Sequence, residues 1–223
     1  EALERETGRD ALVAADRNLG RRVAALLDRW GVEPDDSSGR PLALTPPGVF
    51  LTSVAGLLAK AFDPVALLAL LKHPLSAAPP LDVARLEMEG LRNRDRAHHL
   101  SSVPALIAAR ASDKDPLASE ALASVLRSLT PWRGGEPQDL SAFVRLHRAA
   151  AETAAGEDLW KEQAGIAALA ALDRLEVAAE AYGPTDPAEY PSLLAAALSE
   201  AGDVAADPFR GHPRLSIWGT LEA

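Results

Sequence analysis

The residues best suited to chemistry in this chain are arginines and small polar residues within its first 45 positions. The set comprises Arg17, Arg21, Arg22 and Arg40, with Ser37, Ser38 and Gly39 next to the last of these. Guanidinium groups bind phosphate, and hydroxyl and backbone N–H groups add further donors. Ligands of open α/β sheets bind at the carboxyl ends of strands, and the first three arginines follow an apolar run that predicts a strand. The alternative is that these arginines only form the solvated face of a helix.

The histidines offer two further candidate sites, and both are better explained by helix ends. His98 and His99 lie near Asp95, but adjacent helical residues point about 100° apart, which is poor geometry for a shared zinc ion. We expect a solvated helix end there. His73 precedes Pro74, so it is expected to end a helix as a cation that interacts favourably with the helix dipole.

The sequence contains none of the common catalytic motifs. The acidic pairs Asp35-Asp36 and Glu157-Asp158 are more typical of turns and helix caps than of catalytic dyads. A GxxxxGK[ST] phosphate loop, an HExxH zinc motif and a GxSxG nucleophile motif are all absent from the sequence, and it has no cysteine. We therefore expect no catalytic centre, no metal and no cofactor in this chain.

Composition favours a helical, intracellular protein. Hydrophobic residues make up 48% of the 223 positions but aromatic residues only 4%, and alanine and leucine dominate, which favours helices over sheets. The absence of cysteine fits a reducing cytoplasm, and no apolar run is long enough to span a bilayer. The net charge is −9, whereas a small autonomous nucleic-acid binder usually carries a basic surplus.

The first predicted elements are a short strand and an amphipathic helix. Ala11–Ala15 is apolar enough for a buried strand, Asp16 is a candidate N-cap, and Gly31 can end the helix in a left-handed conformation. The apolar face of this helix is expected to be buried, with Trp30 as a core residue rather than a base-stacking platform. That face comprises Leu19, Val23, Leu26, Leu27 and Trp30.

The rest of the chain is predicted to be mainly helical until a final strand. Thr45-Pro46-Pro47 and Asp63-Pro64 are typical helix starts. Further helices are expected over 81–94, 103–111, 115–129, 139–154, 157–182 and 186–201, with a flexible connection at 132–137. In the helix over 157–182 the predicted buried stripe comprises Leu159, Ile166, Leu169, Leu172, Leu175 and Tyr182. Leu215–Trp218 is the final apolar strand. The predicted fold is mainly α: a multi-helix insertion on a small partial α/β base formed by the two chain ends.

Several of these segments resemble a known family. The segment from Ala11 to Leu51 resembles motif IV and the sequence that follows it in UvrD-like superfamily 1 helicases, and is most similar to the AddB subunits of alphaproteobacterial AddAB helicase–nucleases. Within it, DDSSGRPLALTPPG resembles the family's Asp-x-Ser-x-Gly-x-Pro-Leu turn. LLALLKHPL resembles a helix with a Leu-Leu-Lys-His-Pro-Leu ending, and HPRLSIWGTLEA resembles the strand that leads into the next helicase motif. The likeness covers the first 75 residues and the end of the chain.

The resemblance implies a domain plan and a role in double-strand break repair. It implies a 2A-like α/β domain over 1–45 and 210–223, and a helical 2B-like domain over 46–209. Active relatives have an arginine that senses the ATP γ-phosphate at the position of Ala14, so an inactivated helicase domain is implied. The implied partners are an AddA-like helicase–nuclease subunit and, through the full complex, single- and double-stranded DNA, including the regulatory Chi sequence. The implied DNA contacts are Arg17, Ser38, Gly39, Arg40 and Thr45.

Two other function classes remain open from the sequence. One is a stand-alone helical protein-interaction module with no role on DNA. The other is an active nucleotide hydrolase, which the missing phosphate loop disfavours. Parallel pairing of Leu12–Ala14 with Leu215–Trp218 is expected if the helices form an insertion between two parts of one sheet.

Overall fold

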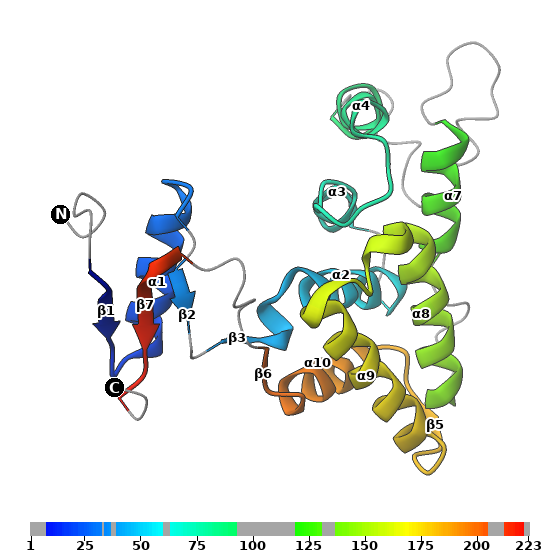
Figure 1. Cartoon of the computed structure of the whole chain (residues 1–223). Coiled ribbons are helices and arrows are strands. Elements are labelled where there is room, and N and C mark those ends of the chain that lie inside the picture. Colours follow the sequence, from blue (N-terminus) through cyan, green and yellow to red (C-terminus); the bar gives the residue numbers. More distant parts are fainter. Residues whose placement is uncertain are drawn as a thin grey trace. The chain divides into compact units, whose positions relative to one another are not determined.

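The chain folds into two compact units. The computed structural model describes residues 8–32, 34–36, 39–59, 63–92, 119–130, 137–204 and 212–220. Unit 1 comprises Glu1–Leu42 and Gly202–Ala223, and unit 2 comprises Ala43–Ala201. Helices account for most of the described residues and the strands are short, which confirms the predicted mainly-α fold with a small partial sheet (Figure 1).

Unit 1 contains a three-stranded parallel sheet built from both ends of the chain. Its strands are β1 (Asp10–Val13), β2 (Pro34–Asp36) and β7 (His212–Trp218), in the order β1-β7-β2. β7 pairs in parallel with β1, from Asp10 opposite Leu215 to Val13 opposite Trp218. The expected pairing of the first and last strands is therefore confirmed. The helical unit 2 is inserted between them in the sequence.

Helix α1 (Arg17–Asp28) follows β1 and packs on this sheet. The Asp16 carboxylate accepts a hydrogen bond from the Asn18 N–H at 2.8 Å, so the predicted N-cap is confirmed. Gly20 permits the close approach of helix and sheet, because a Cβ at this position would lie 3.2 Å from Ile217 Cγ2. Gly31 has a φ of +70° and follows the helix, as predicted.

A second, two-stranded ladder lies where the chain leaves and re-enters unit 1. Strand β3 (Arg40–Pro41) pairs antiparallel with β6 (Asp203–Val204), and the Leu42 N–H donates to the Gly202 carbonyl at 3.1 Å. Gly39 precedes β3 with a φ of +68°, and a Cβ there would lie 2.7 Å from the Val204 carbonyl oxygen. This position therefore requires glycine for both its backbone conformation and its lack of a side chain.

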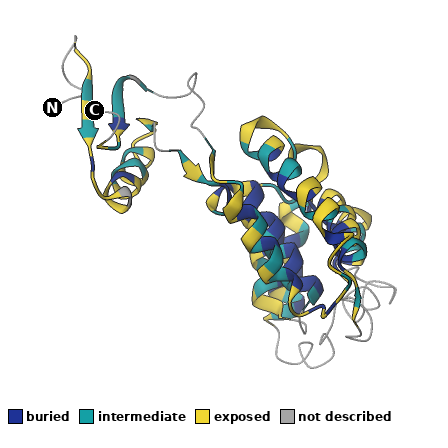
Figure 2. Cartoon of the chain, turned by 90° about the horizontal axis from the view of Figure 1, so that it is seen from below, coloured by how far each residue is buried: buried dark blue, intermediate teal, exposed yellow. Residues whose placement is uncertain are grey.

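Unit 2 is a helical domain in which α2, α8, α9 and α10 pack against one another. Its core includes the fully buried side chains of Phe50, Phe143 and Tyr190, and buried residues are concentrated in these helices (Figure 2). The described elements are η1 (Leu42–Leu44, which begins in unit 1), α2 (Pro46–Ala59), α3 (Pro64–Leu71), α4 (Pro80–Arg85), η2 (Leu86–Leu91), α7 (Glu120–Ser128), β4 (Gln138–Asp139), α8 (Leu140–Ala155), η3 (Gly156–Asp158), α9 (Glu162–Ala179), β5 (Pro184–Thr185) and α10 (Tyr190–Glu200).

Side-chain caps begin two of these helices where the sequence predicted them. The Asp63 carboxylate accepts hydrogen bonds from the N–H groups of Val65 and Ala66 at the start of α3. The Thr45 hydroxyl accepts one from the Gly48 N–H at 3.3 Å at the start of α2. Both starts are confirmed, because a cap depends on residues that are adjacent in the sequence.

Several predicted helices differ from the structure, and the one predicted over 186–201 begins only at Tyr190. The helix predicted over 81–94 is the short α4 followed by the π-helix η2, which ends at Leu91. The helix predicted over 157–182 begins only at Glu162, whose φ of +58° sets it apart from the preceding turn η3. The segments predicted at 103–111, 115–118 and 132–136 lie outside the described residues.

The predicted buried stripe of α9 is also wrong in part. Ile166 is 64% exposed and Tyr182, just beyond the helix, is 60% exposed. The buried side of α9 consists mostly of small residues, which allow neighbouring helices to approach closely. These residues are Gly165, Ala168, Ala171, Leu172 and Ala179.

Candidate functional site

The residues proposed from sequence to contact DNA are distributed over both units. Arg17 is the first residue of α1, and Gly39 and Arg40 lie at β3 in unit 1. Thr45 belongs to unit 2, and Ser38 lies outside the described residues. The two candidate arginines of unit 1 therefore lie on different elements: Arg17 begins helix α1, which follows the three-stranded sheet, and Arg40 lies in the separate β3–β6 ladder.

Thr45 has a structural position in the fold. It is only 4% exposed, and its hydroxyl accepts the Gly48 N–H described above. A side chain that caps a helix and is withdrawn from solvent is poorly placed to contact a nucleic acid. Arg40 is exposed in the two-residue strand β3 and is better suited to that role.

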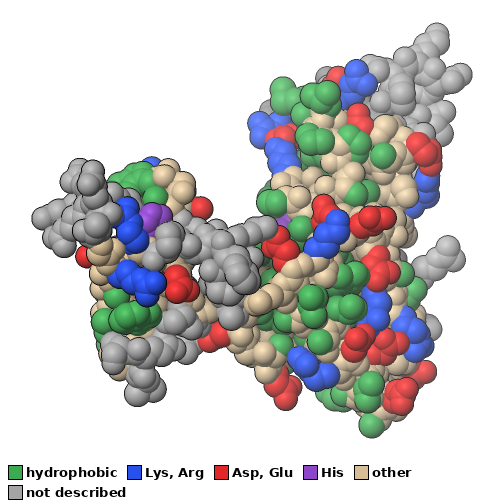
Figure 3. Space-filling view, in the orientation of Figure 1, with side chains coloured by type: hydrophobic (Ala, Val, Ile, Leu, Met, Phe, Trp, Pro, Cys, Tyr) green, Lys and Arg blue, Asp and Glu red, His purple; other side chains and the backbone are tan. Residues whose placement is uncertain are grey.

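Three exposed arginines extend the basic character of α1. Arg21 and Arg22 lie within the helix and Arg29 immediately follows it. Basic and hydrophobic side chains occur side by side on the surface of unit 1 (Figure 3). The helix carries a single acidic residue, Asp28, so its local charge is opposite in sign to that of the chain as a whole.

The carboxyl end of β1 lacks the features of a nucleotide-binding loop. Ala14 is 8% exposed, and its N–H donates to the Trp218 carbonyl at 2.9 Å, which extends the sheet by one residue. The Asp16 carboxylate then accepts the Asn18 N–H at the start of α1. In nucleotide-binding folds the N–H groups of such a helix start bind phosphate. A carboxylate in this position opposes the approach of a phosphate by charge repulsion.

The prediction that Trp30 is a core residue is wrong. Trp30 is 75% exposed, and Leu26 and Leu19 on the same side of α1 are 54% and 44% exposed. The apolar periodicity of this helix is real, but the structure buries only one edge of it, around Gly20, against the sheet. Val23 and Leu27 are half-buried, and Leu19, Leu26 and Trp30 are exposed.

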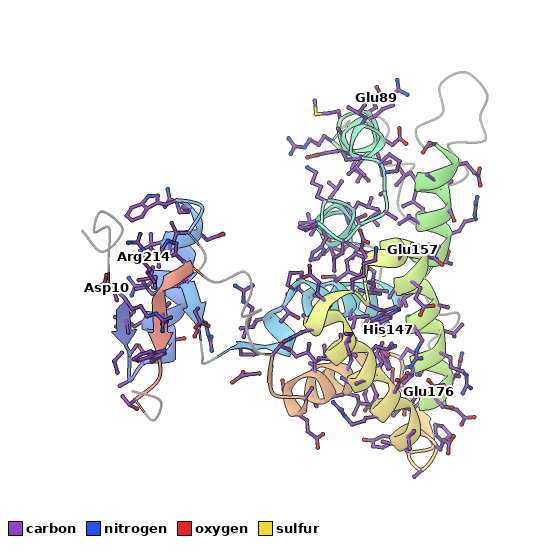
Figure 4. All side chains as sticks on the ribbon, viewed as in Figure 1. Asp10, Glu89, His147, Glu157, Glu176 and Arg214 are labelled. Carbon is purple, nitrogen blue, oxygen red and sulfur yellow. The ribbon has the colours of Figure 1, made fainter. Side chains whose placement is uncertain are left out.

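A buried polar pair that was not predicted from the sequence lies in the centre of unit 2. His147, on α8, has no exposed surface, and it lies among the helices of unit 2 (Figure 4). Its Nε2 lies 2.9 Å from the Leu51 carbonyl oxygen of α2, and its Nδ1 lies 2.8 Å from the Tyr190 hydroxyl of α10. A carbonyl oxygen can only accept, so Nε2 carries the proton and Nδ1 accepts from the tyrosine.

This pair is a structural connection and not a catalytic dyad. Burial lowers the pKa of His147 to about 4 and raises the pKa of Tyr190, so both side chains are neutral near pH 7. Both are fully buried, so no substrate in solution reaches them. Each ring hydrogen bond joins α8 to a different helix, which fixes the positions of three helices. The detectable signal in the sequence was a histidine on the apolar stripe of α8, four residues after Phe143.

A charged cluster connects α8 to α9 at the surface. Arg148 Nη2 lies 2.5 Å from the Asp173 carboxylate and 3.2 Å from that of Glu176. Arg145 adds a longer contact of 3.8 Å to Glu176. These arginines are engaged by carboxylates of the same unit, so they do not form a free anion-binding surface.

Glu87 in the π-helix η2 forms a second charged cluster. Glu87 is 8% exposed, and its carboxylate forms an ion pair with the Lys72 ammonium. The same carboxylate lies 2.5 Å from the Arg92 guanidinium. The hydrogen bond from Lys72 lowers the pKa of Glu87. Lys72 directly follows α3, so this cluster fastens η2 to α3. The sequence did not reveal it, because a π-helix displaces residues from the 3.6-residue pattern.

His73 ends α3 as predicted, but its charge differs from the expectation. Its Nδ1 accepts a hydrogen bond from the Leu75 N–H at 3.2 Å, and its ring lies 5.2 Å from that of Phe50. Burial lowers the pKa of His73. An accepting Nδ1 belongs to a neutral ring, so His73 stabilises the turn after α3 as a hydrogen-bond acceptor and not as a cation.

The candidate metal site at His98 and His99, near Asp95, lies outside the described residues. Within the described ranges, no group of three or more histidine, aspartate or glutamate side chains is arranged to hold a metal ion. None of the described helices combines the length and the hydrophobicity that crossing a membrane requires.

Comparison of the chain with family models, with curated proteins and with solved structures finds no match.

Proposed function

We propose that this chain is a non-catalytic helicase-like segment of a double-strand break repair helicase–nuclease subunit of the AddB type. In this proposal unit 1 is part of a 2A-like domain and unit 2 is the 2B-like helical domain inserted into it. The segment guides single-stranded DNA, contributes to Chi recognition and helps to assemble the complex with an AddA-like subunit.

The observation that carries this proposal is the parallel pairing of β1 with β7. A strand near each end of the chain contributes to one sheet, and a helical domain of about 160 residues lies between them in the sequence. A stand-alone helical module has no need for this arrangement, whereas a domain inserted into an α/β motor domain requires it. The Asp16 cap at the start of α1 also supports a segment that does not bind nucleotide.

The charge distribution supports a DNA role only within a larger assembly. Unit 1 contains nine basic and twelve acidic residues, and unit 2 contains fourteen basic and twenty acidic residues, so the net charges are −3 and −6. Phosphate contacts provide most non-specific DNA affinity. Arg40 and Arg17 therefore act as local contacts, and the complex supplies the remaining affinity.

The test has two parts, one for each half of the proposal. The chain is co-expressed with an AddA-like subunit, and co-purification through size exclusion is expected. The complex is then crosslinked to single-stranded DNA, with crosslinks expected at Gly39–Arg40 and at Arg17. An Arg40→Glu variant should reduce the crosslinking yield, whereas Arg127→Glu, an exposed arginine on α7, should not. Absence of co-purification together with absence of crosslinks would overturn the proposal.

The second candidate function is a helical protein-interaction module without a DNA role. The acidic balance of both units favours it, as does the use of Arg145 and Arg148 in ion pairs within unit 2. Co-purification with a protein partner, in a complex that gives no DNA crosslink to this chain, would support this candidate over the first.

A further inference from the structure

The exposed side of α1 combines an apolar stripe with a line of positive charge. Leu19, Leu26 and Trp30 are separated by seven and four residues, so they lie within about 40° of one another around a helix of 3.6 residues per turn. Their exposed fractions are 44%, 54% and 75%. We call these three residues the α1 stripe. It extends past the last turn of the helix.

Two arginines run alongside this stripe. Arg22 and Arg29 are both exposed and seven residues apart, so they form a second line about 60° around the helix from the first. The one acidic residue of α1, Asp28, lies on the opposite side, about 160° from the stripe. The surface next to the stripe is therefore positively charged, although the whole chain carries a charge of −9.

We propose that the α1 stripe is a docking surface for an amphipathic helix of a partner protein, with acidic residues along the flank that faces Arg22 and Arg29. Three large apolar side chains along one side of a helix match the i, i+3, i+4, i+7 spacing of a second helix. The arginine line fixes the sign of charge that the partner must present. This inference rests on the assembly role in the proposed function and names the surface that carries it.

Nucleic acid fits this surface less well than protein does. Trp30 could stack on a base, but Leu19 and Leu26 have no aromatic face, and two of the three stripe residues would remain exposed. Unit 1 also has a net charge of −3, which opposes a polyanion at longer range. A helix with acidic residues along one flank, unlike nucleic acid, carries negative charge only on the side that faces Arg22 and Arg29.

A second copy of this chain is the competing occupant. Helix α9 carries Ile166 and Val177, which are 64% and 72% exposed, with Asp173 on the same side. Asp173 is, however, already paired with Arg148. The charge that a second copy would offer to the arginine line is therefore partly used within its own unit.

The test uses two designed helical peptides of about 20 residues, each labelled with a fluorescent dye and long enough to form a stable amphipathic helix. Both peptides have the same leucine stripe. One carries glutamates along one flank and the other carries lysines in the same positions. Fluorescence anisotropy with the full chain measures each dissociation constant. We expect the glutamate peptide to bind about tenfold more tightly than the lysine peptide, as two flanking charge pairs can provide.

Variants locate the binding surface. Trp30→Ala should weaken binding of the glutamate peptide several-fold, whereas Val177→Ala, a matched exposed residue on α9, should leave it unchanged. The double variant Arg22→Glu/Arg29→Glu should reverse the preference, so that the lysine peptide binds more tightly. Arg21→Glu lies on another side of α1 and should not reverse it. Circular dichroism confirms that each variant retains its helices.

Several outcomes would overturn the docking surface. They are no binding of either peptide, equal binding of both, or no effect of Trp30→Ala. Self-association in sedimentation equilibrium that Trp30→Ala abolishes would assign the stripe to a second copy. Displacement of the peptide by oligo(dT) would assign it to nucleic acid. The co-purification experiment with an AddA-like subunit is independent, so the docking surface and the proposed function can fail separately.

Discussion

The two units of this chain differ in how far they bury their large apolar side chains. Unit 2 encloses a large apolar core that includes Phe50, Phe143 and Tyr190, which have no exposed surface, although Ile166 and Val177 of α9 are exposed. Unit 1 leaves Trp30 75% exposed, and Val13 and Trp218 of its sheet are 49% and 37% exposed. Parallel sheets are usually covered on both faces, and within the described residues of unit 1 helix α1 covers only one. Within the described residues, unit 2 therefore has a closed core beneath some exposed apolar side chains, whereas the sheet of unit 1 is covered by a helix on one face only.

The largest expected change in stability is for a substitution in the core of unit 2. Phe143→Ala should lower the free energy of unfolding by about 3 to 5 kcal/mol, because it leaves a cavity in a closed core. Urea unfolding followed by circular dichroism at 222 nm measures this change. A loss below about 1 kcal/mol would mean that the core of unit 2 is loosely packed, and the contrast between the units would fail.

The second prediction concerns pH and the buried His147. In the unfolded chain this histidine binds a proton near pH 6.5, but in the folded chain only near pH 4. Acidification between these values favours the unfolded state, so stability is complete above about pH 6.5 and decreases as the pH falls towards 4. The decrease contributed by this side chain should reach about 3 kcal/mol. Urea unfolding at intervals across this range measures it.

A glutamine variant is the control for that pH dependence. His147→Gln retains one donor and one acceptor for Leu51 and Tyr190 but does not titrate. Its stability curve between pH 6.5 and 4 should be flatter than that of the parent chain. Identical slopes for the two proteins would show that other groups cause the acid sensitivity.

The third prediction compares two glycines of unit 1 that have nearly the same backbone conformation. Gly39→Ala should destabilise unit 1 by about 2 to 3 kcal/mol, because it adds both left-handed strain and an overlap with the Val204 carbonyl. Gly31→Ala adds the strain alone, since no atom lies within 4 Å of its Cβ position, and should cost about 1 kcal/mol. Hydrogen exchange of the Ala14 amide, which is bonded to β7, reports on unit 1. Equal effects of the two variants would show that the β3–β6 contact can relax.

The smallest change in stability is expected for Trp30, the exposed tryptophan of unit 1. Trp30→Ala should change the free energy of unfolding by less than about 0.5 kcal/mol, because the side chain contributes little to the core of this chain. The same urea titration measures it. A loss comparable to that of Phe143→Ala would show that Trp30 is covered in solution, and unit 1 would then have a closed core.

Local features of this fold were predictable from the sequence. Asp16, Thr45 and Asp63 were identified as helix starts because a cap and its N–H partners are two or three residues apart. The first and last strands were recognisable as short apolar runs. Their pairing followed from the interpretation that the helices are inserted between them.

Features that depend on distant neighbours were not predictable. The periodicity of α1 and α9 predicted an apolar face for each helix. It did not indicate which edge of that face packs against other elements. Trp30 and Ile166 were therefore placed in the core and are exposed. His147 was missed because its two partners, Leu51 and Tyr190, are far away in the sequence. Among the candidate DNA contacts, Thr45 was correctly predicted to begin a helix. Its burial was not predicted.

The pairing of β1 with β7 has a consequence for the order of folding. These strands are about two hundred residues apart, and closing a flexible loop of that length costs about 5 kcal/mol in chain entropy. If unit 2 folds first and the β3–β6 ladder forms, the remaining loop shortens to about 35 residues, and the closure cost falls by about 1.5 kcal/mol. That difference is about tenfold in rate if the transition state includes the closed sheet. The parallel sheet should therefore form last during folding.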